Sequence, residues 1–243
     1  IPWIHNAFEN AAATIAGLES AYKALSKKGK IKKKIKFVAF GGDGGTYDIG
    51  IQALSGALER GHDIVYVCYD NEGYMNTGAQ RSGATPKGAS TTTEPAGKVS
   101  YGKRMRRKDL TAIAAAHHIP YAAQASISHW QDLMQKAKKA IEVDGPAFLN
   151  VLSPCVRFWR IPENKTIEIS KLAVETNFWP LFEVENGKWK LNYKPRERKP
   201  IIEWIKAQGR YKHLLKEENK PVIEEIQKEI DEYFSWLEKM CSI

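Results

Sequence analysis

An apolar segment that runs directly into a glycine-rich turn constrains this chain more than any other feature. Residues 37–46 read Phe-Val-Ala-Phe-Gly-Gly-Asp-Gly-Gly-Thr, and a helical pattern follows from Tyr47. This is the pattern of a β-strand that ends in a tight turn and passes into a helix. Glycines in such a turn let backbone N–H groups approach an anion closely. The stretch therefore predicts a phosphate-binding loop. A glycine turn with a helix-capping aspartate is the alternative.

Asp43, in the middle of this turn, does not suit a simple phosphate site. A carboxylate repels phosphate groups unless a divalent cation lies between them. If the turn binds a ligand, the sequence therefore indicates a diphosphate that is held through Mg²⁺.

Bulk properties indicate one large α/β domain with a small appendage in the 243 residues. No run of 18 apolar residues occurs, so we expect no membrane span. Cys68, Cys155 and Cys241 are far apart and form no Cys-x-x-Cys pair, which suits a reducing cytoplasm. The chain begins at Ile1 without an initiator methionine, and we expect an upstream segment to be missing.

Positive charge is concentrated in two segments, and the net charge is +9. Residues 27–36 contain seven lysines, and residues 98–108 contain Lys98, Lys103, Arg104, Arg106, Arg107 and Lys108. Such segments can contact nucleic acid, an acidic protein or an anionic substrate, but they are more often solvated loops.

The remaining pattern predicts a mostly parallel sheet with helices on both faces. Strands are expected at residues 35–40, 64–69, 121–125 and 147–152. Helices are expected at 6–25, 47–60, 109–116 and 128–142, with Asp109 and Ser128 as N-caps. The second strand is continuously apolar, which is typical of a parallel strand buried on both faces. Residues 70–108 lack periodicity, and a loop of this length after a strand predicts a functional segment.

The composition changes after Cys155, and we place a boundary there. Residues 1–155 are expected to form the α/β domain, and residues 156–243 a C-terminal arm and helices that contact other subunits. Within the second part, residues 164–194 predict an extended arm with short strands, and residues 201–215 and 221–240 predict helices.

Asp43 and Asn71 are expected to face one small volume. Asp43 follows the first predicted strand, and Asn71 follows the second, 28 residues later. One strand–helix–strand unit places the C-terminal ends of its two parallel strands side by side. A carboxylate, an amide oxygen and a backbone carbonyl would then be available to Mg²⁺. A Walker loop requires a lysine that this turn lacks, and a dinucleotide fingerprint requires a glycine where Tyr47 stands.

These residues carry a resemblance to a known family. Gly42-Asp43-Gly44 followed by Asn71 resembles the thiamine-diphosphate-binding motif. The longer segments, residues 42–50, 69–78, 80–82 and 84–86, are similar to the β subunits of the 2-oxoacid:ferredoxin oxidoreductases, which include pyruvate:ferredoxin oxidoreductase. The resemblance covers roughly residues 1–160 and is most specific between Gly41 and Pro86.

The resemblance implies roles for individual residues. Asp43, the Asn71 side chain and the Gly73 carbonyl would hold Mg²⁺. Asn76 would point at the thiazolium carbon and the bound 2-oxoacid, and would be the catalytic residue. The other cofactor-binding positions that it implies are Gly42, Gly44, Gly45, Tyr74, Met75 and Thr77.

The resemblance also implies a reaction. Family members cleave a 2-oxoacid, transfer the acyl group to coenzyme A and pass electrons through [4Fe–4S] clusters to ferredoxin. Pyruvate is the expected substrate, with oxalate or a branched 2-oxoacid as alternatives. Cys155 matches the isolated cysteine that ligates the cluster nearest the cofactor, whereas Cys68 and Cys241 match no ligand position.

Two departures from the family pattern concern partners. The other three cluster cysteines would lie upstream of Ile1, and one thiolate cannot hold a [4Fe–4S] cluster. Either an N-terminal segment is missing, which we favour, or this protein carries no cluster. The glutamate that activates the cofactor would come from the pyrimidine-binding domain of an α subunit. We therefore expect this chain to be inactive alone and to require the α subunit, other subunits and ferredoxin. The basic segments are candidates for docking acidic ferredoxin.

Two other functions remain open at this point. A thiamine-diphosphate decarboxylase or synthase without redox chemistry would not need Cys155. A nucleic-acid-binding protein would need exposed aromatic residues among its basic residues, and the lysine-rich segment at 27–36 has none.

Overall fold

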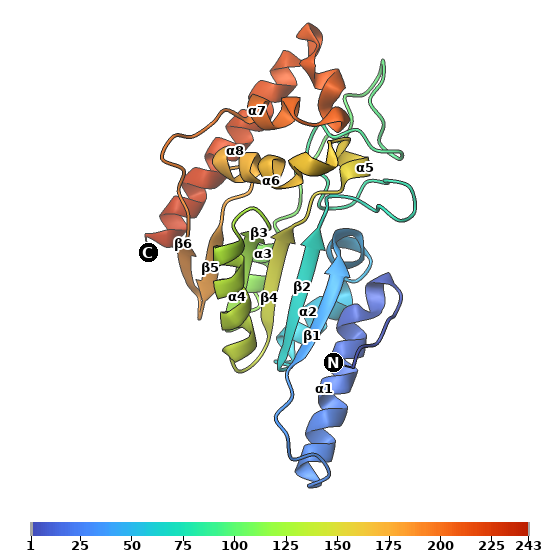
Figure 1. The fold of residues 1–243 in the computed structure, drawn as a ribbon, viewed down its shortest axis with the longest axis vertical. Coiled ribbons are helices and arrows are strands. Elements are labelled where there is room, and N and C mark those ends of the chain that lie inside the picture. Colours follow the sequence, from blue (N-terminus) through green and yellow to red (C-terminus); the bar gives the residue numbers. More distant parts are fainter. Residues whose placement is uncertain (1, 243) are drawn as a thin grey trace.

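A six-stranded sheet forms the centre of the computed structural model, which describes residues 2–242 (Figure 1). Within that range the strand order is β1-β2-β4-β3-β5-β6. The strands are β1 (Phe37–Gly42), β2 (Ile64–Asp70), β3 (Tyr121–Ser126), β4 (Ala147–Leu152), β5 (Phe182–Glu185) and β6 (Lys188–Leu191). The first four are mutually parallel, and β5 and β6 extend the sheet antiparallel. All four parallel strands therefore end at one edge of the sheet, where α/β proteins place their ligands.

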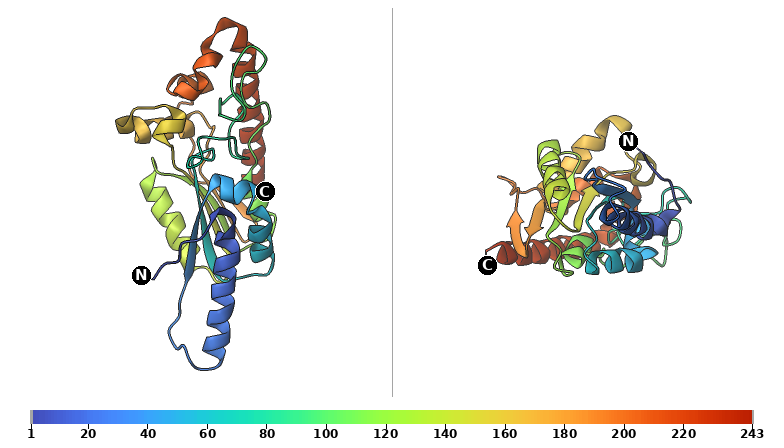
Figure 2. Two further views of the ribbon diagram at one scale, coloured as in Figure 1. Left: turned by 90° about the vertical axis from the view of Figure 1, so that its right-hand side faces the viewer. Right: turned by 90° about the horizontal axis from the view of Figure 1, so that it is seen from below.

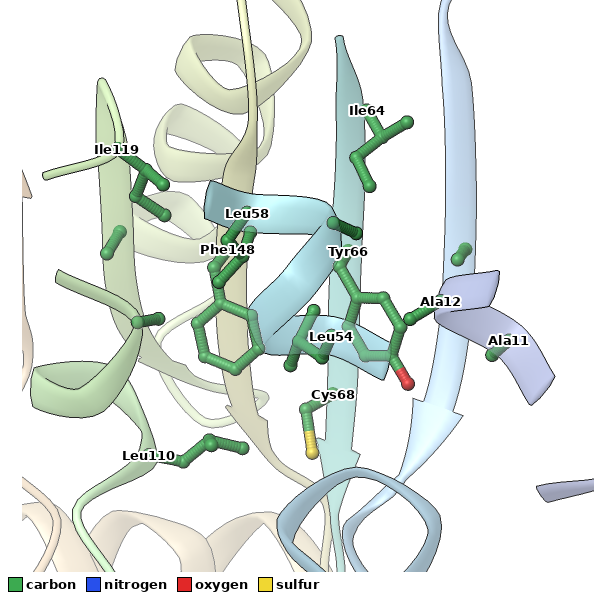
Figure 3. Close-up of a cluster of buried hydrophobic side chains, with 14 of the residues drawn as sticks. Ala11, Ala12, Leu54, Leu58, Ile64, Tyr66, Cys68, Leu110, Ile119 and Phe148 are labelled. Atoms are coloured by element: carbon green, nitrogen blue, oxygen red, sulfur yellow. The ribbon is translucent and has the colours of Figure 1, made fainter. Parts of the chain in front are cut away.

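Helices cover both faces of the sheet, as the sequence predicted (Figure 2). One face carries α1 (Ala11–Lys27), α2 (Ile51–Glu59), α3 (Leu110–Ala115) and α8 (Lys220–Cys241); the other carries α4 (Trp130–Glu142). The first layer buries a continuous apolar cluster against the strands, in which Tyr66, Cys68 and Phe148 point from β2 and β4 toward Leu54 and Leu58 of α2 (Figure 3). Burial of such side chains stabilises the fold by about 1.5–3 kcal/mol each.

A cap of short helices lies over the C-terminal edge of the parallel strands (Figure 1). It consists of α5 (Val156–Trp159), α6 (Thr166–Glu175), α7 (Ile201–Lys206) and the 3₁₀ segments η3 (Glu163–Lys165), η4 (Gly209–Leu215) and η5 (Glu217–Asn219). Trp159, Trp179 and Trp204 are each at most 1% exposed at its centre. The cap is thus a second apolar core that sits directly above the strand ends.

Several expected elements differ from the structure. The glycine turn does not precede a helix that starts at Tyr47; it already forms the π-helical turn η2 (Gly44–Asp48), and α2 follows. Asp109 caps α3 as predicted, by accepting a hydrogen bond from Ala112 N at 3.0 Å. The prediction of a serine cap on α4 is wrong, because Ser128 contacts His129 instead of the first turn.

The segment after Cys155 is also more regular than predicted. The extended arm expected over residues 164–194 is wrong for its first half, where α6 forms and buries Ile169, Ala173 and Val174. Its two short strands are confirmed as β5 and β6, which pair with the main sheet through β3. By contrast, the long loop is confirmed: residues 71–109, all within the described part of the chain, contain only isolated β-bridges. Among residues 2–242, no helix has the length and apolar character needed to cross a bilayer.

Glu183 is the most heavily paired carboxylate at the β3–β5 junction. It is 3% exposed and accepts hydrogen bonds from Tyr121 (2.7 Å), Lys139 (3.0 Å) and Asn192 (3.1 Å). Burial alone would raise the pKa of this carboxyl group, but the three donors outweigh it and lower the pKa to about 2.

Replacing Glu183 by glutamine is expected to lower the free energy of unfolding by about 1.5–3 kcal/mol near neutral pH, the range for a hydrogen bond to a charged group. Because the folded pKa lies below the ordinary value of 4.5, this contribution is complete above about pH 4.5 and is lost as the pH falls toward 2. The difference between wild type and Glu183→Gln in urea unfolding should close over that interval. Glu185→Gln is the control, since Glu185 shares Lys139 but is exposed. A pH-independent difference for Glu183→Gln would contradict the assignment.

Candidate active site

The C-terminal ends of β1 and β2 bring Asp43 and Asn71 into contact. Gly42 and Tyr69 are register partners at these ends, so the residues just beyond them are neighbours. The backbone N–H of Asn71 donates to Asp43 Oδ1 at 3.3 Å. The second carboxylate oxygen of Asp43 accepts a hydrogen bond from Ser82 Oγ at 2.5 Å, so the long loop closes the other side. The expected juxtaposition of Asp43 and Asn71 is therefore present.

The side-chain amide of Asn71 joins three polar groups at this point. One of its terminal atoms lies 2.8 Å from Asp43 Oδ1 and 2.9 Å from the Gly73 carbonyl oxygen. An amide nitrogen in that position donates to both oxygens, whereas an amide oxygen there places three acceptors face to face. Neighbouring oxygens in a Mg²⁺ octahedron are about 2.9 Å apart, given bonds of 2.0–2.1 Å. The chemistry and the spacing of this donor set therefore fit Mg²⁺ when the amide presents its oxygen.

Asp43 has no cationic partner of its own among the described residues. Its side chain is 1% exposed, and burial, followed by the nearby Asp70 carboxylate, raises the pKa of Asp43 well above its ordinary value. A divalent cation against the carboxylate would reverse both effects by favouring the ionised form. The surroundings of Asp43 therefore disfavour its ionised form unless a positive charge lies against the carboxylate.

Packing explains why two of the turn residues are glycines. A Cβ on Gly44 would lie 2.4 Å from the ring of Tyr74, and a Cβ on Gly45 would lie 2.8 Å from the Phe8 carbonyl oxygen. The Tyr74 hydroxyl donates to the Gly44 carbonyl at 2.9 Å. Tyr74 therefore closes over the turn, and glycine is needed there whether or not a ligand binds.

The loop after Gly73 places its predicted residues in two environments. Tyr74 and Met75 are half-buried, and Met75 packs against the cap. Asn76 and Thr77 are exposed at the tip, where Thr77 Oγ1 donates to Gln80 Oε1 at 2.5 Å. Asn76, the predicted catalytic residue, is thus presented toward the outside of this chain.

Cys155 lies just past the end of β4, the strand next to β2. Its side chain is half-buried, and it precedes α5, whose Trp159 donates from Nε1 to the Asn71 carbonyl at 3.0 Å. Cys68 is fully buried in β2, and Cys241 lies at the end of α8. Across residues 2–242 no group of three or more Cys, His, Asp or Glu side chains is arranged to hold a metal. Cys155 alone does not satisfy a [4Fe–4S] cluster.

A buried network that the sequence did not reveal supports the site. Asp70, the last residue of β2, accepts hydrogen bonds from Tyr47 and Arg107, each at 2.6 Å. Arg107 also pairs with Glu72 at 2.8 Å and stacks on Trp179, with its guanidinium carbon 4.4 Å from the ring centre. The length of the loop was the only feature of the sequence that indicated this network. No residue near Arg107 in the sequence indicates that its side chain points into the protein.

Lys103 is a second buried cation that the sequence did not single out. It is 1% exposed, and its ammonium group donates to the carbonyls of Ser82, Gly83 and Thr85. Burial lowers the pKa of this lysine to about 8. Its position fixes the loop segment from which Ser82 reaches Asp43.

The two basic segments have different surroundings. Residues 27–36 form a largely exposed loop at the end of the molecule opposite the candidate site (Figure 1). In residues 98–108, Arg106 pairs with Glu229 and Glu232, each at 3.1 Å, and Lys108 pairs with Asp48 at 2.7 Å. Lys103 is buried and Arg107 is partly buried, whereas Lys98, Arg104, Arg106 and Lys108 are exposed. The second segment is thus divided between the interior and the surface of this chain.

Comparison with known proteins agrees with this geometry. Residues 2–151 match the family described as thiamine pyrophosphate enzyme, C-terminal TPP binding domain. The pyruvate synthase subunit PorB of Thermotoga maritima is 58% identical over 234 residues, which are 95% of this chain and 72% of that protein. The protein of the same name from Methanocaldococcus jannaschii is also 58% identical, over 96% of this chain and 77% of the relative.

A relative with another name and a solved structure extend the comparison. The ketoisovalerate oxidoreductase subunit VorB of Pyrococcus abyssi is 49% identical over 98% of this chain and 76% of that protein. The solved 2-oxoglutarate:ferredoxin oxidoreductase of Magnetococcus marinus superimposes with a TM-score of 0.52 at 24% identity, over 67% of this chain and 58% of that one, which shows a shared fold. The chain therefore belongs to the thiamine-diphosphate-binding subunits of the 2-oxoacid:ferredoxin oxidoreductase family.

Proposed function

We propose that this subunit holds Mg²⁺ and the diphosphate of thiamine diphosphate at the C-terminal edge of β1 and β2. The observation that carries the proposal is the approach of the Asn71 amide to both Asp43 Oδ1 and the Gly73 carbonyl, at 2.8 and 2.9 Å. Asp43, Asn71 and Gly73 would be the metal ligands. The backbone of Gly42, Gly44 and Gly45 would hold the diphosphate, and Tyr74, Met75 and Thr77 would line the cofactor.

Thiamine diphosphate supplies a carbanion that adds to the carbonyl of a 2-oxoacid. The residues of this chain orient the cofactor and exclude water. Asp43 contributes the charge that the metal requires, and it is 1% exposed, with Ser82 of the long loop against its carboxylate. Asn76 is exposed on its loop, and we propose that its amide meets the substrate at the boundary with another subunit.

The substrate and the partners of this chain are proposals that rest on the relatives. Two relatives are named as pyruvate synthase subunits and one as a ketoisovalerate oxidoreductase subunit. Pyruvate is the proposed substrate, with a branched 2-oxoacid as the alternative. The proposed partners are an α subunit that supplies the activating glutamate, other subunits of the complex, coenzyme A and ferredoxin.

The division of labour within the chain is also a proposal. Residues 1–155 would bind the cofactor, and residues 156–243 would contact other subunits. The second part is not independent of the first, since β5 and β6 complete the sheet and the cap buries the cofactor edge.

Cys155 is proposed as one ligand of a [4Fe–4S] cluster. Its half-buried side chain beside the strand that ends at Asp70 suits a ligand close to the cofactor. A complete cluster needs three further ligands, which would have to come from outside residues 2–242 because Cys68 is enclosed in β2 and Cys241 lies at the end of α8.

Replacing Asp43 by asparagine in the complete complex is expected to weaken thiamine diphosphate binding in the presence of Mg²⁺ by at least about 100-fold. The change keeps the shape of the side chain but removes the only carboxylate of the proposed ligand set, and loss of even a supporting group costs 10–100-fold. Calorimetric titration measures the effect. Asp63→Asn is the matched control, because Asp63 lies at the opposite end of β2. Affinity within threefold of wild type would rule out Asp43 as a ligand.

Replacing Cys155 by serine is expected to remove about four iron atoms per subunit, the content of one [4Fe–4S] cluster, together with part of the visible absorption. Thiamine diphosphate binding should remain, because Cys155 is not among its proposed ligands. Iron analysis of the anaerobically purified complex measures the loss, and Cys241→Ser serves as control. Unchanged iron content in Cys155→Ser would favour a thiamine-diphosphate subunit without this cluster.

A further inference from the structure

Glu72, which lies between the two proposed metal ligands Asn71 and Gly73, is held by arginines on both sides. Its carboxylate is fully buried, and Arg107 contacts Oε1 at 2.8 Å. Arg210 of η4 contacts Oε2 at 2.5 Å and is itself fully buried. Arg210 therefore connects the cap to a residue 138 positions earlier in the chain.

The backbone of Glu72 is held as firmly as its side chain. Its φ angle is +70°, in the left-handed region that residues other than glycine seldom adopt. Its N–H donates to Asp70 Oδ1 at 3.0 Å, and its carbonyl accepts from Thr85 Oγ1 at 2.6 Å. Such a conformation persists only where the surroundings enforce it, and strained backbone of this kind clusters at ligand sites.

The restraint on Glu72 also acts on its two neighbours in the chain, Asn71 and Gly73. The Gly73 carbonyl and the Asn71 side chain lie on either side of Glu72, so a change in its φ and ψ would move them relative to each other. Their contact at 2.9 Å is one edge of the proposed donor set. The restraint on Glu72 thus fixes the distance between two proposed metal ligands, although Glu72 itself is not one of them.

A contribution to folding stability does not by itself explain why an arginine, Arg210, occupies this buried position. A buried ion pair is often no more stable than apolar side chains of the same volume. Arg210 has abundant apolar contact, with its guanidinium carbon 4.0 Å from the ring centre of Trp159 and 5.0 Å from that of Phe158. One of its terminal nitrogens, Nη1, lacks a hydrogen-bond partner within the described part of the chain. An apolar residue at position 210, paired with an uncharged residue at position 72, would fill this site without leaving a donor unpaired, but it would not restrain the segment at Glu72.

We propose that Arg210 is a positioning residue for the cofactor metal: through Glu72, it holds Asn71 and Gly73 at the spacing that Mg²⁺ requires. This inference rests on the proposed Mg²⁺ site. It makes the C-terminal cap part of the cofactor-binding apparatus, although no cap residue other than Arg210 pairs with the Glu72 carboxylate among residues 2–242.

The test is the Mg²⁺ concentration that gives half-maximal thiamine diphosphate binding to the complete complex, followed by calorimetry or tryptophan fluorescence. Arg210→Met, which keeps an unbranched apolar stem but removes the guanidinium group, is expected to raise this concentration at least tenfold. Ile205→Ala is the matched control, since Ile205 is buried in the same apolar cluster and does not contact Glu72. It should lower the melting temperature while shifting the Mg²⁺ requirement less than twofold.

A double variant separates positioning from folding. Arg210→Met leaves the buried Glu72 charge with Arg107 as its one remaining arginine partner, and adding Glu72→Gln removes that charge. The melting temperature of the double variant should therefore recover relative to Arg210→Met. The Mg²⁺ requirement should remain at least tenfold above wild type, because the restraint on the loop is still missing.

Two results would overturn the inference in distinguishable ways. Equal Mg²⁺ shifts in Arg210→Met and Ile205→Ala, or a normal Mg²⁺ requirement in the double variant, would reduce Arg210 to a structural residue while leaving the metal site intact. Thiamine diphosphate binding by the wild-type complex that is independent of Mg²⁺ would overturn the metal site itself, and the inference with it.

Discussion

A charged side chain that is buried away from water needs an opposite charge beside it. This requirement determines how the C-terminal edge of the parallel strands is built. Asp70 and Glu72 are both buried at the end of β2, and Arg107 and Arg210 lie against them. Leaving one partner of such a pair unmatched costs about 3–5 kcal/mol. The long loop that carries Arg107 and the cap that carries Arg210 must therefore close onto the strand ends. Asp43 differs from Asp70 and Glu72, because it has no cationic partner among the described residues.

Regular features of the sequence predicted the sheet and half of the site. Short apolar segments bounded by turn residues identified the four parallel strands. The continuously apolar, β-branched run at residues 64–69 further indicated a strand buried on both faces. The contact between Asp43 and Asn71 was predicted from the strand–helix–strand topology alone, because each residue comes directly after one of two adjacent parallel strands. The importance of residues 71–109 followed from their length and their position at the carboxyl edge of the sheet.

Features that depend on distant partners could not be predicted. Arg107 and Lys103 read as a solvated basic run, yet both turn inward because buried carboxylates and carbonyls lie across the loop. Nothing near Arg210 in the sequence indicates Glu72, and nothing near Ser82 indicates Asp43. Residues 166–175 were assigned to an extended arm because charged residues interrupt their apolar pattern, yet they form α6, which packs Ile169, Ala173 and Val174 into the core of the cap.

The 138-residue separation between Glu72 and Arg210 has a consequence for biosynthesis. Ribosomes add about 5–20 residues per second, so about 7–28 s pass between the synthesis of these two residues. Throughout that interval, β1, α2 and β2 are already complete, but the segment that joins the proposed ligands lacks one of its two counter-charges. Glu72 consequently gains its second arginine only when η4 has been synthesised. The proposed cofactor site, which depends on Glu72, would thus be completed late in translation.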